Sequence, residues 1–156
     1  MPEPTPGQRR IELYVRDGLP EPTRERGRDL TAAIERLVED GLADSATVTT
    51  CAKRYPLADD AASVPFVSFE EWADRAGVSL TPCFGTRTCY CTESGKRQRY
   101  RVVPAFVLAV YDDDRLRAVY PHVDDRPYSV PEGIEALRER DQRERLTESV
   151  GRGAAD

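Results

Sequence analysis

The sequence predicts an α/β domain in which helices cover a mixed β-sheet, and three stretches carry this prediction. Residues 102–111 form the longest apolar run, contain no charge and precede the acidic residues 112–114, which is typical of a strand buried on both faces. Residues 10–16 alternate between apolar and polar side chains, as a half-buried strand does. Apolar residues between 30 and 38 recur at helical spacing and predict a helix that covers the sheet.

The composition predicts one globular domain that stays in the cytoplasm. Of the 156 residues, 39% are hydrophobic and 33% are charged, which suits a soluble chain with a real core. No apolar run approaches the ~20 residues needed to cross a bilayer, and residues 1–7 lack the apolar segment of a secretory signal. We expect a flexible N-terminus over 1–8, a single domain over 9–140 and a flexible charged extension over 141–156.

The charge pattern is acidic and poor in lysine. The net charge is −5, and only Lys53 and Lys96 among the 23 basic residues are lysines. This pattern is typical of proteins of salt-loving archaea, because 1 M salt shortens the Debye length to ~3 Å and weakly hydrated arginine forms bidentate pairs. A GC-rich genome, which favours arginine codons, is the alternative explanation.

Capping and turn signals predict the boundaries of the helices. The first helix is expected to begin after an N-cap at Thr23 and to end at Gly41, with a short strand to follow. Residues 53–65 are predicted to form a loop. Capping boxes that begin at Ser68 and at Ser129 predict the second and third helices.

Residues 86–101 predict a β-hairpin inserted before the central strand. Two alternating polar stretches flank residues 93–96, which have turn chemistry. After the central strand, residues 112–114 are expected to turn the chain back into an antiparallel strand over 115–120. Three carboxylates could hold a divalent ion, but a solvated turn explains them fully.

Without the hairpin, this order of elements resembles the thioredoxin-like fold. The resemblance rests on the buried run after Pro104, the acidic turn, the strand over 116–120 and the helix from Ser129. It implies a three-layer sandwich with a mixed sheet. When the core strands are counted along the chain without the hairpin, their order in the sheet is fourth, third, first, second. It also implies that Pro104 is a cis-proline, which is otherwise uncommon. A ferredoxin-like α+β arrangement is the alternative fold.

The chain departs from that family where the redox members keep their cysteines. Those members carry a Cys-x-x-Cys between the first strand and the first helix, whereas residues 17–23 contain no cysteine. The thiolate that would attack a disulfide is therefore missing, and oxidoreductase activity is not expected.

A second resemblance covers nearly the whole chain. Residues 10–16, 71–73, 108–113 and 120–122 together resemble small, largely uncharacterised haloarchaeal proteins that are often labelled helix-turn-helix domain proteins. The label implies DNA binding and transcription control. A helix-turn-helix needs two helices joined by a turn of ~3–4 residues, whereas a strand and a long loop separate the first two predicted helices here.

The hairpin is the predicted nucleic-acid interface because it combines basic and aromatic side chains. These are Arg87, Tyr90, Lys96, Arg97, Arg99, Tyr100 and Arg101. Strand alternation places Arg97, Arg99 and Arg101 on one face. A basic ribbon can lie in a major groove or follow phosphates, and tyrosines can stack on exposed bases. Alternatively, these arginines pair with surface carboxylates or with another subunit, since an acidic chain repels a polyanion at low salt.

The cysteines form a second candidate site. In a cytosolic protein we expect free thiols, metal ligands or redox groups rather than disulfides. Cys83, Cys89 and Cys91 surround the predicted hairpin base, and Cys51 or His122 could complete a tetrahedral zinc site. Paired Cys-x2-Cys knuckles are absent, and small half-buried positions suit cysteine equally well. His122 is the only histidine and is expected at the surface of a loop.

These observations predict a non-enzymatic binding or regulatory protein with no resident cofactor, which contacts nucleic acid through the hairpin. One alternative is a protein-interaction or oligomerisation module. Another is a zinc-binding protein or a thiol-based redox sensor that uses the cysteines of the hairpin.

Overall fold

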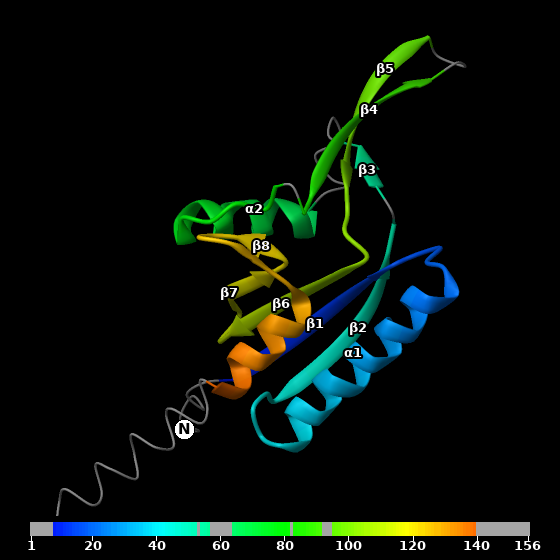
Figure 1. Cartoon of the computed structure of the whole chain (residues 1–156). Helices are drawn as coiled ribbons and strands as arrows, with labels where there is room; N and C mark the ends of the chain where they lie inside the picture. The colour runs from blue at the N-terminus through cyan, green and yellow to red at the C-terminus, as the bar shows by residue number, and fades with distance from the viewer. Residues whose placement is uncertain (1–7, 53, 57–63, 82, 92–94, 140–156) are drawn as a thin grey trace, which may run out of the picture.

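The chain forms a four-stranded sheet with helices on both faces and a three-stranded sheet that projects from it (Figure 1). This computed structural model describes residues 8–52, 54–56, 64–81, 83–91 and 95–139. The labelled elements are β1 (Arg9–Arg16), α1 (Glu21–Glu39), β2 (Ser45–Cys51), β3 (Arg54–Pro56), α2 (Val64–Ala76), β4 (Gly85–Cys91), β5 (Lys96–Val102), β6 (Phe106–Asp112), β7 (Arg115–Tyr120), β8 (His122–Val123) and β9 (Pro127–Tyr128). Residues 130–139 are also helical. No helix in these ranges is long and apolar enough to span a membrane.

The four-stranded sheet has the order β2-β1-β6-β7. β1 pairs with β2 in parallel and with β6 in antiparallel fashion, and β6 pairs with β7 in antiparallel fashion. Without the hairpin strands this is the predicted order of fourth, third, first, second. The α/β prediction is therefore confirmed. The apolar run is not a single strand, however, because Val102 ends β5 and only residues 106–111 of the run belong to β6, an inner strand of the sheet.

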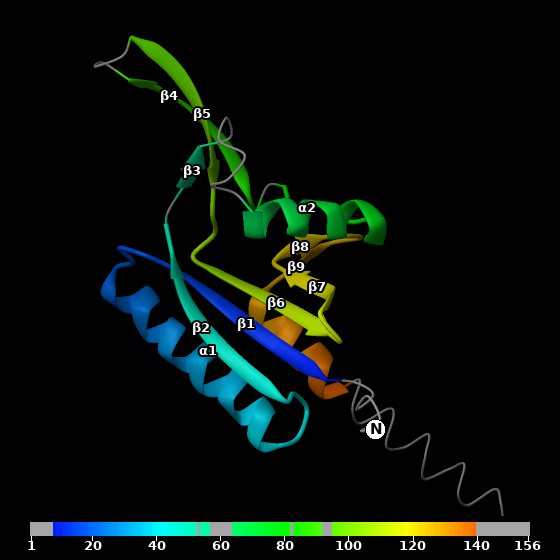
Figure 2. The same cartoon turned by 180° about the vertical axis from the view of Figure 1, so that it is seen from behind.

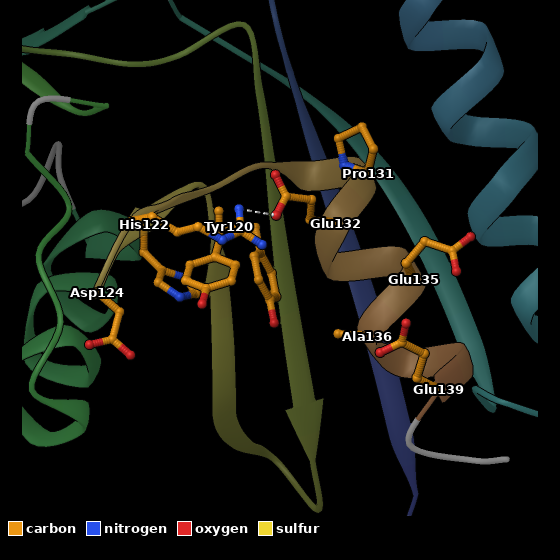
Figure 3. Close-up of a pocket in the computed structure, with 10 residues that line it drawn as sticks. Tyr120, His122, Asp124, Pro131, Glu132, Glu135, Ala136 and Glu139 are labelled. Carbon is orange, nitrogen blue, oxygen red and sulfur yellow. Dashed lines mark hydrogen bonds and ion pairs between the residues drawn. The ribbon is translucent and has the colours of Figure 1, made fainter. Parts of the chain in front are cut away.

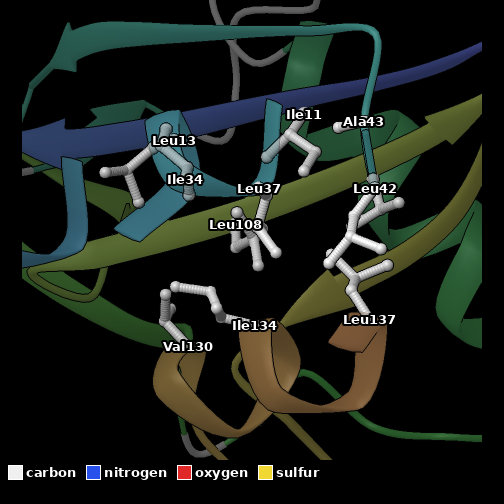
Figure 4. Packing of buried hydrophobic residues seen from close by; sticks show 11 residues of the cluster. Ile11, Leu13, Ile34, Leu37, Leu42, Ala43, Leu108, Val130, Ile134 and Leu137 are labelled. Atoms are coloured by element: carbon white, nitrogen blue, oxygen red, sulfur yellow. The ribbon is translucent and has the colours of Figure 1, made fainter. Parts of the chain in front are cut away.

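The two faces of this sheet bury separate clusters of apolar side chains. On one face, Ile11 and Leu13 of β1 and Leu108 of β6 pack against α1 and the helix at 130–139 (Figure 4). On the other face, residues of β6 and β7 pack against Phe69 and Trp72 of α2. Residues 107–110 of β6 are at most 2% exposed because the strand is covered on both faces.

The first two helices begin earlier than the sequence predicts. α1 starts at Glu21 after Pro20, with no side-chain cap, so the N-cap predicted at Thr23 is wrong. α2 starts at Val64, so Ser68 lies within the helix and the capping box predicted there is also wrong. Both helices accept a proline in the first turn, where its missing N–H would have no intrahelical partner in any case.

The predicted end of the first helix at Gly41 and the predicted start of the third helix at Ser129 are confirmed. Gly41 has a φ of +77°, which glycine adopts without strain, and its N–H donates to the Val38 carbonyl. The Ser129 hydroxyl accepts from the Glu132 N–H at 3.4 Å and lies 3.2 Å from a Glu132 carboxylate oxygen. Ser129 therefore caps the helix at 130–139.

The prediction of a cis bond before Pro104 is wrong. Among the described residues the cis X-Pro bond is Tyr120–Pro121, where β7 ends and β8 begins. The position of a proline before a buried strand does not set its isomer, since most X-Pro bonds are trans.

The hairpin of β4 and β5 belongs to a second sheet with the order β3-β5-β4. It extends away from the four-stranded sheet in both views (Figures 1 and 2). Residues 54–56 form β3 and pair with β5, so the loop predicted over 53–65 is wrong there. Three residues are too few to show the alternation that identifies a strand. The predicted turn residues 93 and 94 lie outside the described ranges.

Candidate nucleic-acid interface

The base of the hairpin is fixed to the body of the protein by two core residues. Phe84 precedes β4 and Val103 follows β5, and they are 1% and 0% exposed. Both belong to the apolar cluster that α2 covers. The strands between them extend beyond this anchor (Figure 2).

The register of the hairpin divides the predicted interface into two faces. One face carries three cross-strand pairs, which are Tyr90 with Arg97, Thr88 with Arg99 and Thr86 with Arg101. Because side chains alternate along a strand, Lys96, Tyr100 and Arg87 lie on the opposite face. The sequence places Arg97, Arg99 and Arg101 together correctly, but the full predicted set does not form a single surface.

Arg101 differs from the other two arginines on its face. Its guanidinium forms an ion pair with the carboxylate of Glu70 in α2, and its side chain is only 17% exposed. The sequence left open the alternative that these arginines pair with surface carboxylates. At Arg101 the structure shows this pairing. This residue links the base of the hairpin to α2, and Glu70 has no sequence signal that would have identified it as the partner.

Arg97 and Arg99 are exposed and have no ion-pair partner among the described residues. Tyr90, directly opposite Arg97, is 63% exposed. β4 and β5 contain no acidic residue. We call Tyr90, Arg97 and Arg99 the hairpin tip. Its positive charge is not neutralised by neighbouring carboxylates within these two strands.

The opposite face of the hairpin is partly covered. The Arg54 guanidinium of β3 lies 4.7 Å from the centroid of the Tyr100 ring, which is a cation–π distance. Arg87, the cross-strand neighbour of Tyr100, is exposed. The sequence does not predict Arg54 beside Tyr100, because the segment of Arg54 reads as a loop.

The described residues bring no metal site together. No group of three or more histidine, cysteine, aspartate or glutamate side chains within them could hold a metal ion. Cys51 is buried in the cluster below α2, and burial raises the pKa of its thiol. Cys83 is a free, half-buried thiol. The side chains of Cys89 and Cys91 lie outside the described part, so the zinc site stays a prediction.

The prediction of a surface histidine is wrong, because His122 is only 9% exposed. It begins β8, and the edge of its ring faces Trp72 with centroids 5.4 Å apart. Its Nδ1 lies 2.6 Å from the Val119 carbonyl oxygen. A carbonyl can only accept, so Nδ1 carries a proton in every charge state of the ring. That nitrogen is not free to bind a metal.

A family model described as a helix-turn-helix domain matches residues 3–142, so the chain belongs to this family. No curated protein and no solved structure gives a significant match. In the described ranges, however, no two helices are joined by a short turn. β2 and β3 lie between α1 and α2, and six strands separate α2 from the helix at 130–139.

Proposed function

We propose that this protein is a nucleic-acid-associated regulator that contacts phosphates with the hairpin tip. Arg97 and Arg99 bind the backbone, and Tyr90 packs against a sugar or an exposed base. The protein acts in the cytoplasm as a binding protein, and this role needs no cofactor.

The observation that carries this proposal is the exposed cross-strand pair of Tyr90 and Arg97, beside Arg99, on a projecting ribbon without acidic residues. A major groove ~12 Å wide admits a two-stranded ribbon. Guanidinium groups bind phosphate in bidentate fashion, and aromatic rings stack on bases. The family description also supports nucleic acid as the partner, with a ribbon in place of a recognition helix.

The net charge of −5 does not prevent such contact. The Debye length at 0.1 M salt is about 10 Å, so charges beyond that distance contribute little to the potential at the tip. Because the ribbon projects from the acidic body (Figure 1), its own arginines dominate the field that a phosphate meets there.

We further infer that the four-stranded sheet is a thioredoxin-like scaffold without redox cysteines. The order and directions of its strands and the absence of cysteine between β1 and α1 support this inference.

The acidic, lysine-poor composition supports the inference that the protein comes from an organism that lives at high salt. Such a protein is expected to gain stability as KCl rises from 0.1 M to 2 M in thermal unfolding, and a loss would contradict the high-salt source.

The test is the affinity for a labelled DNA duplex, measured by fluorescence anisotropy at the lowest KCl concentration at which circular dichroism shows that the protein stays folded. The Arg97→Gln/Arg99→Gln variant is compared with Arg36→Gln/Arg115→Gln, which removes two exposed arginines from α1 and from the start of β7. We expect the tip variant to bind at least about tenfold more weakly, because charge-assisted hydrogen bonds are each worth about 1.5–3 kcal/mol. The control should stay within about threefold of the wild type.

Two results would overturn the proposal. One is a wild type that binds neither duplex nor single-stranded DNA at any salt concentration. The other is an equal loss in both double variants, which would mean that overall charge, and not the hairpin tip, determines binding.

A further inference from the structure

The two edges of the four-stranded sheet, β2 and β7, differ in how well they are protected. β7 carries Arg115 and Arg117, and the register of its pairing with β6 is irregular. The Arg117 carbonyl also accepts a hydrogen bond from the indole of Trp72 in α2 at 2.9 Å. Charged side chains, bulges and covering elements keep an edge strand from pairing with another chain. The β7 edge has all three.

The β2 edge has none of these protections. Its seven residues, Ser45–Cys51, include no charged residue and no proline. Residues 47–50 are exposed, and Val48 leaves 46% of an apolar side chain in contact with solvent. The register with β1 is regular over the whole strand, and in the described part of the chain no strand pairs with the outer side of β2. Such an edge is a template for a further strand.

The pairing with β1 shows which backbone groups of β2 point outward. The Asp17 N–H donates to the Cys51 carbonyl at 2.8 Å, and Cys51 is the register partner of Arg16. Because residues of a parallel strand bond the same neighbour alternately, the odd-numbered residues of β2 bond β1. Residues 46, 48 and 50 therefore direct their N–H and C=O groups to the open edge.

These outward groups define a register in which β2 is complementary to itself. In an antiparallel pair, two hydrogen-bonded residues lie directly opposite each other and exchange both bonds. A two-fold axis at Val48 places Val48 opposite Val48 of a second copy, and Ala46 opposite Thr50. All outward groups at these three positions then gain a partner. The same register places Thr47 opposite Thr49, which is a stabilising cross-strand pair.

The charges beside the two ends of β2 are complementary under the same axis. Asp44 precedes β2, Arg54 follows it, and both are exposed. Antiparallel pairing brings the start of one β2 to the end of the other, so Asp44 of each copy comes near Arg54 of the second copy. The strand itself adds no like-charge pair across the axis. These features favour a second copy of this chain over an unrelated peptide.

We propose that β2 pairs in antiparallel fashion with β2 of a second copy, about a two-fold axis at Val48. The pairing joins the two four-stranded sheets into one continuous sheet and gives a closed dimer. One strand from each copy is a small interface, so the dimer exchanges reversibly with the monomer. The proposal does not depend on the role of the hairpin, whose strands belong to another sheet.

The first test is sedimentation equilibrium of the full chain in 1 M KCl. At this concentration the Debye length is ~3 Å, so the repulsion between two copies that each carry a net charge of −5 is screened. We expect the average mass to rise from the 17.5 kDa of one chain towards twice this value as the protein concentration increases from micromolar to millimolar.

The matched variants are Val48→Pro and Val48→Thr. Proline removes the N–H at the axis, and because this N–H points away from β1, the hydrogen bonds between β1 and β2 are kept. The dissociation constant of the dimer should rise at least about tenfold, since each copy loses one donor at the interface. Threonine keeps the N–H and the branched Cβ, so this variant should stay within about threefold of the wild type. Circular dichroism shows whether both variants are folded.

The second test measures the register and needs no proline. Val48→Cys places two thiols opposite each other at the axis, whereas Thr50→Cys leaves its two thiols four residues apart, at about 13 Å. A disulfide requires Cα atoms within about 7 Å. Under mild oxidation we expect a covalent dimer for Val48→Cys on a non-reducing gel. Thr50→Cys should match the wild type, which controls for the native cysteines.

Three outcomes would overturn the proposal. They are a wild type that keeps the mass of one chain at millimolar concentration, equal dissociation constants for Val48→Pro and Val48→Thr, and equal cross-linking at positions 48 and 50. The first would mean that the β2 edge does not pair with itself. The other two would place the contact elsewhere on the molecule. The Arg97→Gln/Arg99→Gln variant should dimerise like the wild type, so failure of the hairpin proposal and failure of this one are distinguishable.

Discussion

β5 and β6 follow each other in the chain and yet have opposite environments. Residues 107–110 of β6 are at most 2% exposed and are covered by helices on both faces. In β5, Arg97 and Arg99 are exposed, and only the end near Val103 reaches the core. The comparison teaches that burial stabilises the four-stranded sheet, whereas the exposed side chains of the hairpin tip contribute little to the fold.

The largest expected effect of a single change is at the centre of the buried strand. Leu108→Ala should reduce the free energy of unfolding by about 2–5 kcal/mol, because it removes a fully buried side chain and leaves a cavity. Urea unfolding followed by circular dichroism measures this loss. Arg97→Gln is the matched change in the exposed strand and should stay within about 0.5 kcal/mol of the wild type. Similar losses in the free energy of unfolding at both positions would contradict the contrast between β6 and β5.

The next effect concerns the contact between the Tyr120 ring and the helix at 130–139 (Figure 3). Gly133→Ala places a Cβ against the Tyr120 ring and should cost about 1–3 kcal/mol of stability, since the ring has to move. Gly85→Ala is the control, because a Cβ there meets no atom within 4 Å. If Gly133→Ala and Gly85→Ala unfold at the same urea concentration, the packing of Tyr120 on this helix is not as described.

A smaller effect sharpens the difference between the arginines of one hairpin face. Arg101→Gln should lose about 0.5–1 kcal/mol of stability, because it breaks the partly exposed ion pair with Glu70. Combination with Glu70→Gln should add little further loss, since the pair is already broken. Fully additive losses in this double-mutant cycle would show that the ion pair does not stabilise the hairpin base.

Much of the fold is predictable from the sequence because periodicity reports burial. The alternation in residues 10–16 and the uncharged run before Asp112 identify β1 and β6, and the sheet order follows from the resemblance to a known arrangement. The helix at 130–139 is predictable because Ser129 and Glu132 form a local hydrogen-bonded cap.

The errors arise where tertiary contacts decide local structure. β3 exists because it pairs with β5, and its three residues carry no pattern of their own. His122 reads as a loop residue, yet Trp72, from a helix distant in the chain, covers its ring. The pairing of Arg101 with Glu70 likewise depends on how α2 lies beside the hairpin. Sequence alone therefore finds the basic hairpin but cannot separate its structural arginine from its exposed ones.

The salt dependence of DNA binding tests the central claim most directly. The slope of the logarithm of the binding constant against the logarithm of the KCl concentration counts the phosphates that the protein neutralises. We predict that Arg97→Gln/Arg99→Gln makes this slope shallower by about 2, whereas Arg101→Gln leaves it unchanged. Equal slopes for the wild type and the tip variant would contradict the claim that the exposed arginines of the hairpin bind nucleic acid.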